Sequence, residues 1–301
     1  MFIEDVLAGA VRYGSSVIFA TQGELISERA GVINLGIEGS MLCGALAAFA
    51  TASATGSAVA GIFAGLAAGG VLAAIHAFLV IWRGANQLAA GLAISFLGLG
   101  LTAALGVSFV SKQITGLGAI EIPLLSDIPI LGKVLFTQDA LTYLALILPF
   151  IVLFALSRTK WGLILRATGE RPEVVRAYGY DPKHVRAAAV ILGGALAGLG
   201  GAQLVLAYTL NWVENVTVGR GFVAVALVIF GAWRPLGAAA GALVFGAALS
   251  LQLQLQARGV DVSIWLLQMA PYVLTLLVLV FTSRRQSKQI PEDLKAVFGG
   301  T

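Results

Sequence analysis

The chain has 301 residues, of which 58% are hydrophobic and only 11% are charged, and its formal net charge is +4. A soluble domain uses about 25% charged residues to cover its surface, so this composition excludes an ordinary soluble protein. The positive charges cluster beside apolar runs, which argues against nucleic-acid binding and for an all-α, polytopic membrane protein.

Membrane spans are predicted from runs of about 20 apolar residues, the length that crosses the hydrocarbon layer. These runs lie at 6–26, 34–54, 58–82, 87–110, 140–157, 186–209, 219–232, 235–256 and 264–282. The seventh run is short, which indicates a segment that is tilted, continuous with its neighbour, or re-entrant. We therefore expect a single domain over residues 1–301 with 8–10 transmembrane helices, some of them broken or re-entrant.

The orientation of the spans follows from the basic residues, which favour the cytoplasmic side. The polar stretch 158–186 and the C-terminal tail, with Arg284, Arg285, Lys288 and Lys295, are predicted to be cytoplasmic. The segment 111–139 is then the main outer loop, and its Pro and Gly residues predict short re-entrant or interfacial pieces. Nine spans would place the N-terminus outside.

A break in the helical pattern is predicted between Gly23 and Gly39, where several ionisable and amide residues lie between apolar runs. Three glycines within nine positions disfavour a continuous helix, and free backbone at membrane depth must be satisfied by protein or a water-filled cavity. Glu28 and Arg29 could form an exposed cytoplasmic turn. Asn34 and Glu38 lie deeper, where they serve either as structural hydrogen-bonding groups or as the lining of a transport path.

Further polar residues extend the candidate path. Gln87 and Ser95 are eight positions apart, which is about two helical turns, so both are expected on one helix face. Trp212 is either an interfacial anchor or a stacking surface for a ring-shaped solute. The candidate path residues are Asn34, Glu38, Asn86, Gln87, Ser95, Gln203, Trp212, Arg220 and Phe222.

Glycine recurs at four-residue spacing in three of the predicted spans. The repeats are Gly61, Gly65 and Gly69; Gly194 and Gly198; and Gly237 and Gly241. Small residues on one helix face let helix backbones approach closely in lipid, so these repeats predict tight packing rather than chemistry.

Signatures of catalysis are missing from the sequence. There is no G-x-x-x-x-G-K-[ST] motif for a nucleotide, no convincing catalytic arrangement and no Cys/His cluster for a metal. The chain is therefore expected to be a transport subunit that binds no cofactor and is not an enzyme. An intramembrane carboxylate leaves an ion-coupled secondary carrier open as an alternative.

Four blocks in the same order resemble permease subunits of ABC importers in the branched-chain amino acid and simple-sugar group, nearest its nucleoside-importing branch. They are GELISERAGVINLGIEGSMLCGALAAF, ANQLAAGLAISFLGLGLT, LRATGERPEVVRAYGYDPKHVR and GRGFVAVALVIFGAWRPLGAAAGALVFGA. The chain departs from the pattern at Arg171 and Ser95, where the family commonly has Asn. The second departure concerns the solute, because a hydroxyl is smaller than an amide.

The resemblance implies that the third block docks on a cytoplasmic ABC ATPase. Pro172 can begin a short helix there, and Gly179 and Pro182 end it. The implied docking residues are Arg166, Gly169, Glu170, Arg171, Pro172, Glu173, Arg176, Ala177, Tyr178 and Gly179.

The resemblance also implies the partners of the chain in the plasma membrane. They are a second, similar permease subunit, the ATPase that uses ATP and Mg, and an extracytoplasmic solute-binding protein. The implied solute is a nucleoside, with a pentose or hexose as the alternative.

Overall fold

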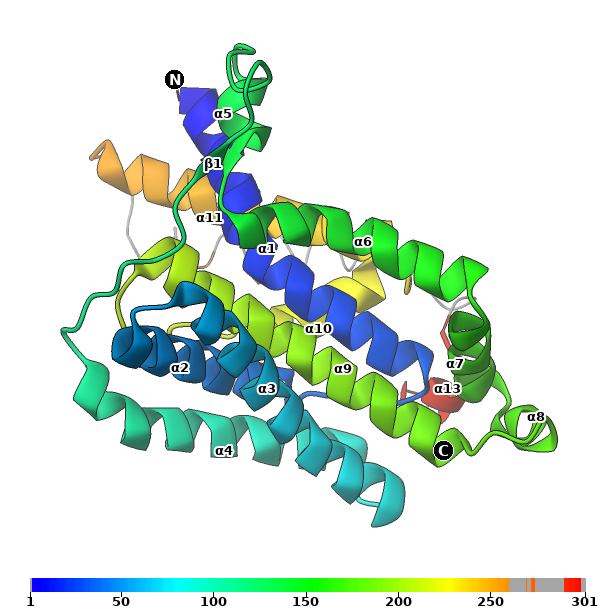
Figure 1. Cartoon of the computed structure of the whole chain (residues 1–301). Coiled ribbons are helices and arrows are strands. Elements are labelled where there is room, and N and C mark those ends of the chain that lie inside the picture. The colour runs from blue at the N-terminus through cyan, green and yellow to red at the C-terminus, as the bar shows by residue number, and fades with distance from the viewer. Residues whose placement is uncertain (1, 260–268, 270–271, 274–289, 299–301) are drawn as a thin grey trace.

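The computed structural model describes residues 2–259, 269, 272–273 and 290–298 (Figure 1). The all-α prediction is confirmed, because two-residue strands are the only strands in this part of the chain. The long helices are α1 (Phe2–Arg29), α2 (Ile37–Thr55), α3 (Ala58–Ala77), α4 (Gln87–Gly106), α6 (Ala140–Arg158), α9 (Pro182–Gln203) and α11 (Pro235–Ala257). The shorter helices are α5 (Leu131–Leu135), α7 (Lys160–Glu170), α8 (Pro172–Ala177), α10 (Arg220–Phe230) and α13 (Glu292–Phe298).

Three short segments continue these helices with altered pitch. The π-helical segments η1 (Phe78–Trp82) and η3 (Leu204–Thr209) extend α3 and α9, and the 3₁₀ segment η2 (Val107–Phe109) extends α4. With these extensions, six helices of the described chain are long and apolar enough to cross a membrane. They match six of the nine predicted spans. Of the other three, 6–26 lies in the more polar α1, 219–232 is the short α10, and 264–282 falls almost entirely outside the described residues.

Helices α1 and α9 cross at the centre of the molecule, with α2, α3 and α4 on one side and α6 on the other (Figure 1). Glycines allow these close crossings. A Cβ atom at Gly98 of α4 would lie 2.5 Å from the Cα atom of Gly39 in α2, and Gly44 of α2 faces Gly198 of α9. The predicted packing role is confirmed for the glycine repeats, because a Cβ atom on Gly65 or any other repeat member would crowd a neighbouring helix.

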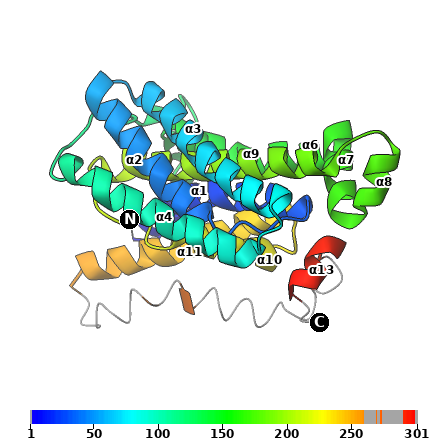
Figure 2. The same cartoon turned by 90° about the horizontal axis from the view of Figure 1, so that it is seen from below.

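The two ends of the bundle differ in structure. At one end, α7, α8 and α13 lie together, well separated from the N-terminus at the other end (Figure 2). There Arg186 of α9 forms an ion pair with Asp293 of α13. At the opposite end, Asp5 of α1 pairs with Lys133 of α5 at 2.8 Å. The N-terminus thus shares an end with the predicted outer loop, and α13, which carries Lys295, shares an end with 158–186, as the span count predicted. Arg284, Arg285 and Lys288 of the predicted tail lie outside the described residues.

Of the two alternatives expected for the segment 111–139, re-entrant or interfacial pieces, the structure contradicts the re-entrant one. It forms an antiparallel pair of strands, β1 (Ile120–Glu121) and β2 (Thr137–Gln138), around the single turn of α5. Its backbone also covers the end of η3: the N–H groups of Ile114 and Leu117 donate to the carbonyls of Leu210 and Leu206 at 3.1 and 2.7 Å. Helix ends leave such carbonyls unpaired, so the loop lies across them rather than re-entering the bundle.

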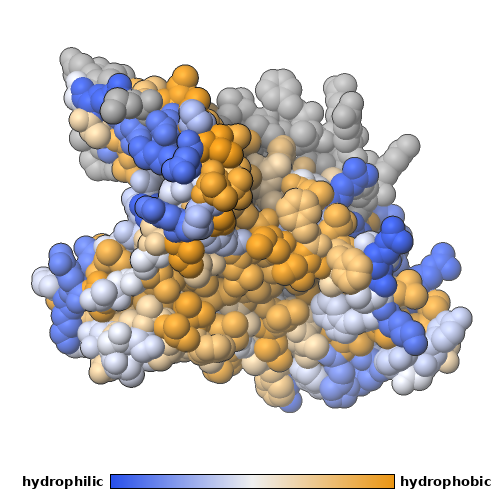
Figure 3. Space-filling view, turned by 45° about the horizontal axis from the view of Figure 1, so that its top comes forward, coloured by the Kyte–Doolittle hydropathy of each residue, from blue (hydrophilic) through white to orange (hydrophobic). Residues whose placement is uncertain are grey.

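The surface carries the pattern of a membrane protein. Hydrophobic residues cover the middle of the face in Figure 3, and hydrophilic residues gather toward its ends. Large apolar side chains such as Phe96, Leu105, Phe150 and Phe154 are more than 60% exposed. Such a surface is stable only where lipid replaces water, so the chain is a multi-pass membrane protein.

Candidate functional site

The predicted break lies at residues 30–36, between α1 and α2, and nearly all of it is buried. Its backbone groups are satisfied by side chains of α1. The Asn34 N–H donates to Glu24 Oε1 at 2.7 Å, and Ser27 Oγ donates to the Val32 carbonyl at 2.8 Å. Non-helical backbone inside a membrane protein is stable only with such partners. The break is therefore held in a defined conformation.

Side chains of α3 and α4 complete the hydrogen bonding of this break. Gln87 Oε1 accepts from the Ile33 N–H at 2.9 Å, and Ser95 Oγ donates to the Leu35 carbonyl at 2.7 Å. The prediction that Gln87 and Ser95 share a helix face is confirmed, because both reach the same segment. The sequence reasoning missed His76, whose Nε2 lies 3.1 Å from the Ile33 carbonyl. The feature that could have identified His76 is its polar ring inside an otherwise apolar span.

Glu38 joins the beginning of α2 to the beginning of α10. Its Oε1 accepts from the Gly219 N–H at 2.9 Å and from the Thr217 hydroxyl, and its Oε2 accepts from the Gly221 N–H at 2.6 Å. A carboxylate at a helix N-terminus satisfies unpaired N–H groups and suits the helix dipole. Of the two roles predicted for Glu38, this geometry supports the structural one.

The two helices that meet at Glu38 both begin inside the bundle. α2 starts next to Ser95, two turns into α4, and α10 starts beside Glu38 and ends at the turn that contacts Arg29. Discontinuous helices that meet at mid-depth are a common construction for solute sites in transporters. Arg220 lies within electrostatic range of Glu38, and Phe222 on the same helix is 38% exposed. Arg220 and Phe222 are thus two more of the predicted path residues that the structure places beside the junction, in addition to Glu38 and Ser95.

Three other predicted path residues lie away from this junction. Gln203 donates through Nε2 to the Arg12 carbonyl at 3.3 Å, near the outer end, and Asn86 is exposed at the N-terminus of α4, where it caps Ala89. Trp212 is only 2% exposed and packs against Phe49, with ring centroids 6.5 Å apart. Its ring is thus neither an interfacial anchor nor an open stacking surface in this structure, because the outer ends of α2 and α4 cover it.

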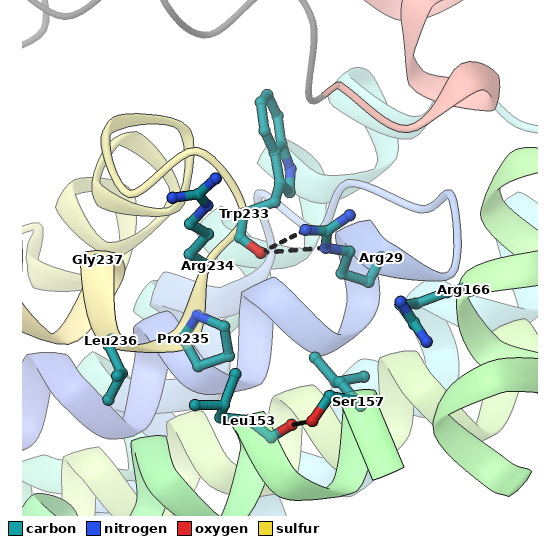
Figure 4. Close-up of a pocket in the computed structure, with 10 residues that line it drawn as sticks. Arg29, Leu153, Ser157, Arg166, Trp233, Arg234, Pro235, Leu236 and Gly237 are labelled. Carbon is teal, nitrogen blue, oxygen red and sulfur yellow. Dashed lines mark hydrogen bonds between the residues drawn. The ribbon is translucent and has the colours of Figure 1, made fainter. Parts of the chain in front are cut away.

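The alternative of an exposed turn at Glu28 and Arg29 is wrong for Glu28, which is fully buried. Glu28 Oε2 accepts from Trp233 Nε1 at 2.5 Å. Arg29 donates through Nε and Nη2 to the Trp233 carbonyl at 3.1 and 2.8 Å, as Figure 4 shows. The turn after α10 folds over this end of α1 and removes Glu28 from solvent, which the sequence of α1 alone could not reveal.

The predicted docking helix is confirmed as a structure. α8 spans Pro172–Ala177 with Tyr178 as its C-cap, and Gly179 adopts a φ of +86°, a conformation that favours glycine. Val175 is buried and holds α8 to the protein, whereas Tyr178 is 80% exposed. The predicted docking residues that are exposed on and around α8 are Glu170, Arg171, Glu173, Arg176, Ala177, Tyr178 and Gly179.

Both neighbours of α8 are capped, so the segment is held at both ends. Thr159 caps α7 through Gly162, and Asp181 caps α9 by accepting from the Lys183 N–H at 2.9 Å. That backbone hydrogen bond is the main reason why the pKa of Asp181 is lowered from its ordinary value.

Two predicted docking residues point inward. Gly169 is buried, and a Cβ atom there would meet the Arg29 carbonyl at the end of α1. Arg166 is half-buried and lines a pocket together with Arg29 (Figure 4). Gly169 thus brings α7 into close contact with the end of α1. Among the described residues, no group of three His, Cys, Asp or Glu side chains could hold a metal ion.

Comparisons with known proteins agree with this arrangement. The family model described as "Branched-chain amino acid transport system / permease component" matches residues 6–282. A putative glucose ABC transporter permease of Haloferax volcanii, TsgC13, is 42% identical over 85% of this chain and 79% of its own length. The nucleoside ABC transporter permease NupC of Lactococcus lactis is 33% identical over 92% of each chain.

A further relative is the guanosine ABC transporter permease NupQ of Bacillus subtilis, which is 34% identical over 91% of this chain and 90% of its own. No solved structure matches the chain.

Proposed function

Since the chain belongs to the family of branched-chain amino acid transport permease components, we propose that it forms half of the nucleoside path in an ATP-driven ABC importer. The observation that carries this proposal is α8. It stands exposed at the basic end of the bundle, anchored by Val175 and framed by two capped helices. A rigid helix that presents Tyr178 and charged side chains outward suits a protein partner.

The proposed mechanism follows from how α8 connects to the interior. An ATPase that grips α8 moves α7 as well, because α7 and α8 are separated by Arg171 alone. α7 packs on the end of α1 through Gly169, and α1 holds the 30–36 break through Glu24. Movement at the cytoplasmic face therefore reaches the mid-depth junction of α2 and α10 through protein contacts. ATP and Mg belong to the ATPase, and this chain supplies the path.

The proposed complex contains more than this chain. A half-path needs a second permease subunit, and a similar but non-identical one fits the family. An extracytoplasmic binding protein delivers the solute at the end that carries α5 and the hairpin. No nucleic acid takes part.

Nucleoside transport is supported by two relatives, the nucleoside permease and the guanosine permease, each aligned over more than nine-tenths of this chain. A sugar is the second candidate, and one observation favours it: the putative glucose permease is 42% identical. Both solutes carry hydroxylated sugar rings, and only the nucleoside adds a flat aromatic base.

Uptake of labelled guanosine, uridine, glucose and ribose decides between these proposals. Cells with and without this gene are compared before and after ATP depletion, with ion gradients maintained. We expect gene-dependent nucleoside uptake that stops when ATP is depleted. If only sugar uptake depends on the gene, the solute is a sugar and not a nucleoside. Nucleoside uptake that survives ATP depletion would indicate an ion-coupled carrier instead.

A further inference from the structure

A pocket of about 510 Å³ opens where the basic ends of α1, α6, α7 and α11 meet. Arginines from three of these regions line it, namely Arg29, Arg166 and Arg234. Figure 4 shows Arg234 on the side of α11, Arg166 on the side of α7 and Arg29 between them. No acidic side chain is among the residues that line the pocket. The pocket therefore concentrates positive charge in a small volume.

Arg29 is positioned before any ligand arrives. Two nitrogens of Arg29 bind the Trp233 carbonyl, which fixes the guanidinium plane. Arg166 Nε is buried and has no hydrogen-bond partner among the described residues. Two carboxylates lie within electrostatic range of Arg29: Glu28, whose Oε2 accepts from the Trp233 indole, and Glu170, which is exposed on α7. A buried guanidinium N–H without a partner calls for an acceptor, and an anionic oxygen is the strongest one.

The opposite wall of the pocket is apolar and faces the lipid. Leu153 and Leu236 are 38% and 42% exposed, and they come from α6 and α11. Beyond Leu153, Phe150 and Phe154 continue the apolar surface of α6. The pocket thus combines a cationic interior with an exposed apolar wall. A free anion or a soluble acidic protein would use only the cationic interior and would have no need of the apolar wall.

We propose that this pocket binds the phosphate-bearing headgroup of an anionic phospholipid from the cytoplasmic leaflet. The phosphate accepts from Arg166 and its neighbours, and an acyl chain lies along α6 and α11. Basic pockets between transmembrane helices on the cytoplasmic side are suited to such headgroups. The inference rests on the basic end being cytoplasmic, but not on the nature of the solute. A lipid there would brace α7 against α1 at the base of the docking segment.

The test is lipid binding by the purified chain, measured by native mass spectrometry. The probes are phosphatidylglycerol and phosphatidylcholine with identical acyl chains, and inorganic phosphate as a competitor. The pocket variant is Arg166→Gln with Arg234→Gln. The matched control is Arg83→Gln with Lys183→Gln, which removes the same charge from exposed positions at the same end. Size-exclusion profiles establish that each variant is folded. If the double variant is not folded, the single Arg166→Gln variant is used in its place.

We expect the wild-type chain and the control to prefer phosphatidylglycerol, and the pocket variant to bind it at least roughly tenfold more weakly, since each basic residue contributes to headgroup affinity. Equal binding of the two lipids by the wild-type chain would overturn the proposal. An equal loss in the control would do so too, because net charge alone would then explain it. Displacement of the lipid by millimolar inorganic phosphate would reassign the pocket to a free anion.

Discussion

Replacement of Glu38 tests whether the junction of α2 and α10 is held by its carboxylate. Glu38→Ala leaves the Gly219 and Gly221 N–H groups and the Thr217 hydroxyl without their acceptor. A buried donor without a partner costs about 1–3 kcal/mol, so the two backbone donors together predict a loss of about 2–6 kcal/mol. Glu38→Gln keeps one oxygen acceptor and should cost about 1–3 kcal/mol, because one donor then faces the amide nitrogen.

Thermal unfolding in mild detergent, followed by tryptophan fluorescence, measures these losses. The expected order of stability is wild type, Glu38→Gln and then Glu38→Ala. Glu214→Gln is the matched control, since Glu214 is exposed in the segment before α10 and its replacement should change stability by less than about 0.5 kcal/mol. If Glu38→Gln unfolds at the wild-type temperature yet stops uptake, the carboxylate acts on the solute, and the structural role assigned to it is wrong.

Three further predictions address the docking segment, the helix packing and the outer end. Glu170→Arg combined with Glu173→Arg should uncouple ATP hydrolysis from uptake while the protein still inserts; normal uptake would refute the docking assignment. Gly98→Ala brings a Cβ atom to 2.5 Å from a backbone atom of α2 and should destabilise the bundle by ~1–3 kcal/mol. Gly100→Ala, with nothing within 4 Å, should be neutral or stabilising by ~0.5–1 kcal/mol in the same unfolding assay. The hydrogen bond from Lys133 lowers the pKa of Asp5 below 3.8. This contact therefore contributes stability above that pH, and the contribution is lost as the pH falls further. A fluorophore on α5 should report the release of α5, and Lys133→Gln should abolish this transition.

Several parts of the fold could be predicted because they depend on local sequence. The short docking helix follows from Pro172 at its start and Gly179 after its end, two residues whose backbone preferences act without tertiary contacts. The break after α1 follows from the glycines between Gly23 and Gly39. The shared face of Gln87 and Ser95 follows from helical periodicity, and both side chains indeed reach the same segment.

The roles of single polar residues were harder to predict, because they depend on which helices become neighbours. From the sequence alone, Glu28 could lie in an exposed turn. In the structure it is covered by the residues around Trp233, which are more than two hundred positions away in the chain. The contact between His76 and the Ile33 carbonyl could not be predicted either, because His76 lies on α3 whereas the break lies between α1 and α2. Trp212 became part of the core because Phe49 and α4 meet it.

The sequence by itself determined that this chain is a helical membrane protein, which of its ends is basic, where its first break falls and where the short helix after Arg171 begins. These properties depend on composition, periodicity and local backbone preference, all of which act over a few turns. Only the tertiary structure decided that Glu38 caps α10, that Glu28 is buried and that three arginines surround one pocket. Such contacts join residues up to about two hundred positions apart, and the packing of glycine-lined helices, rather than any local pattern, brings them together.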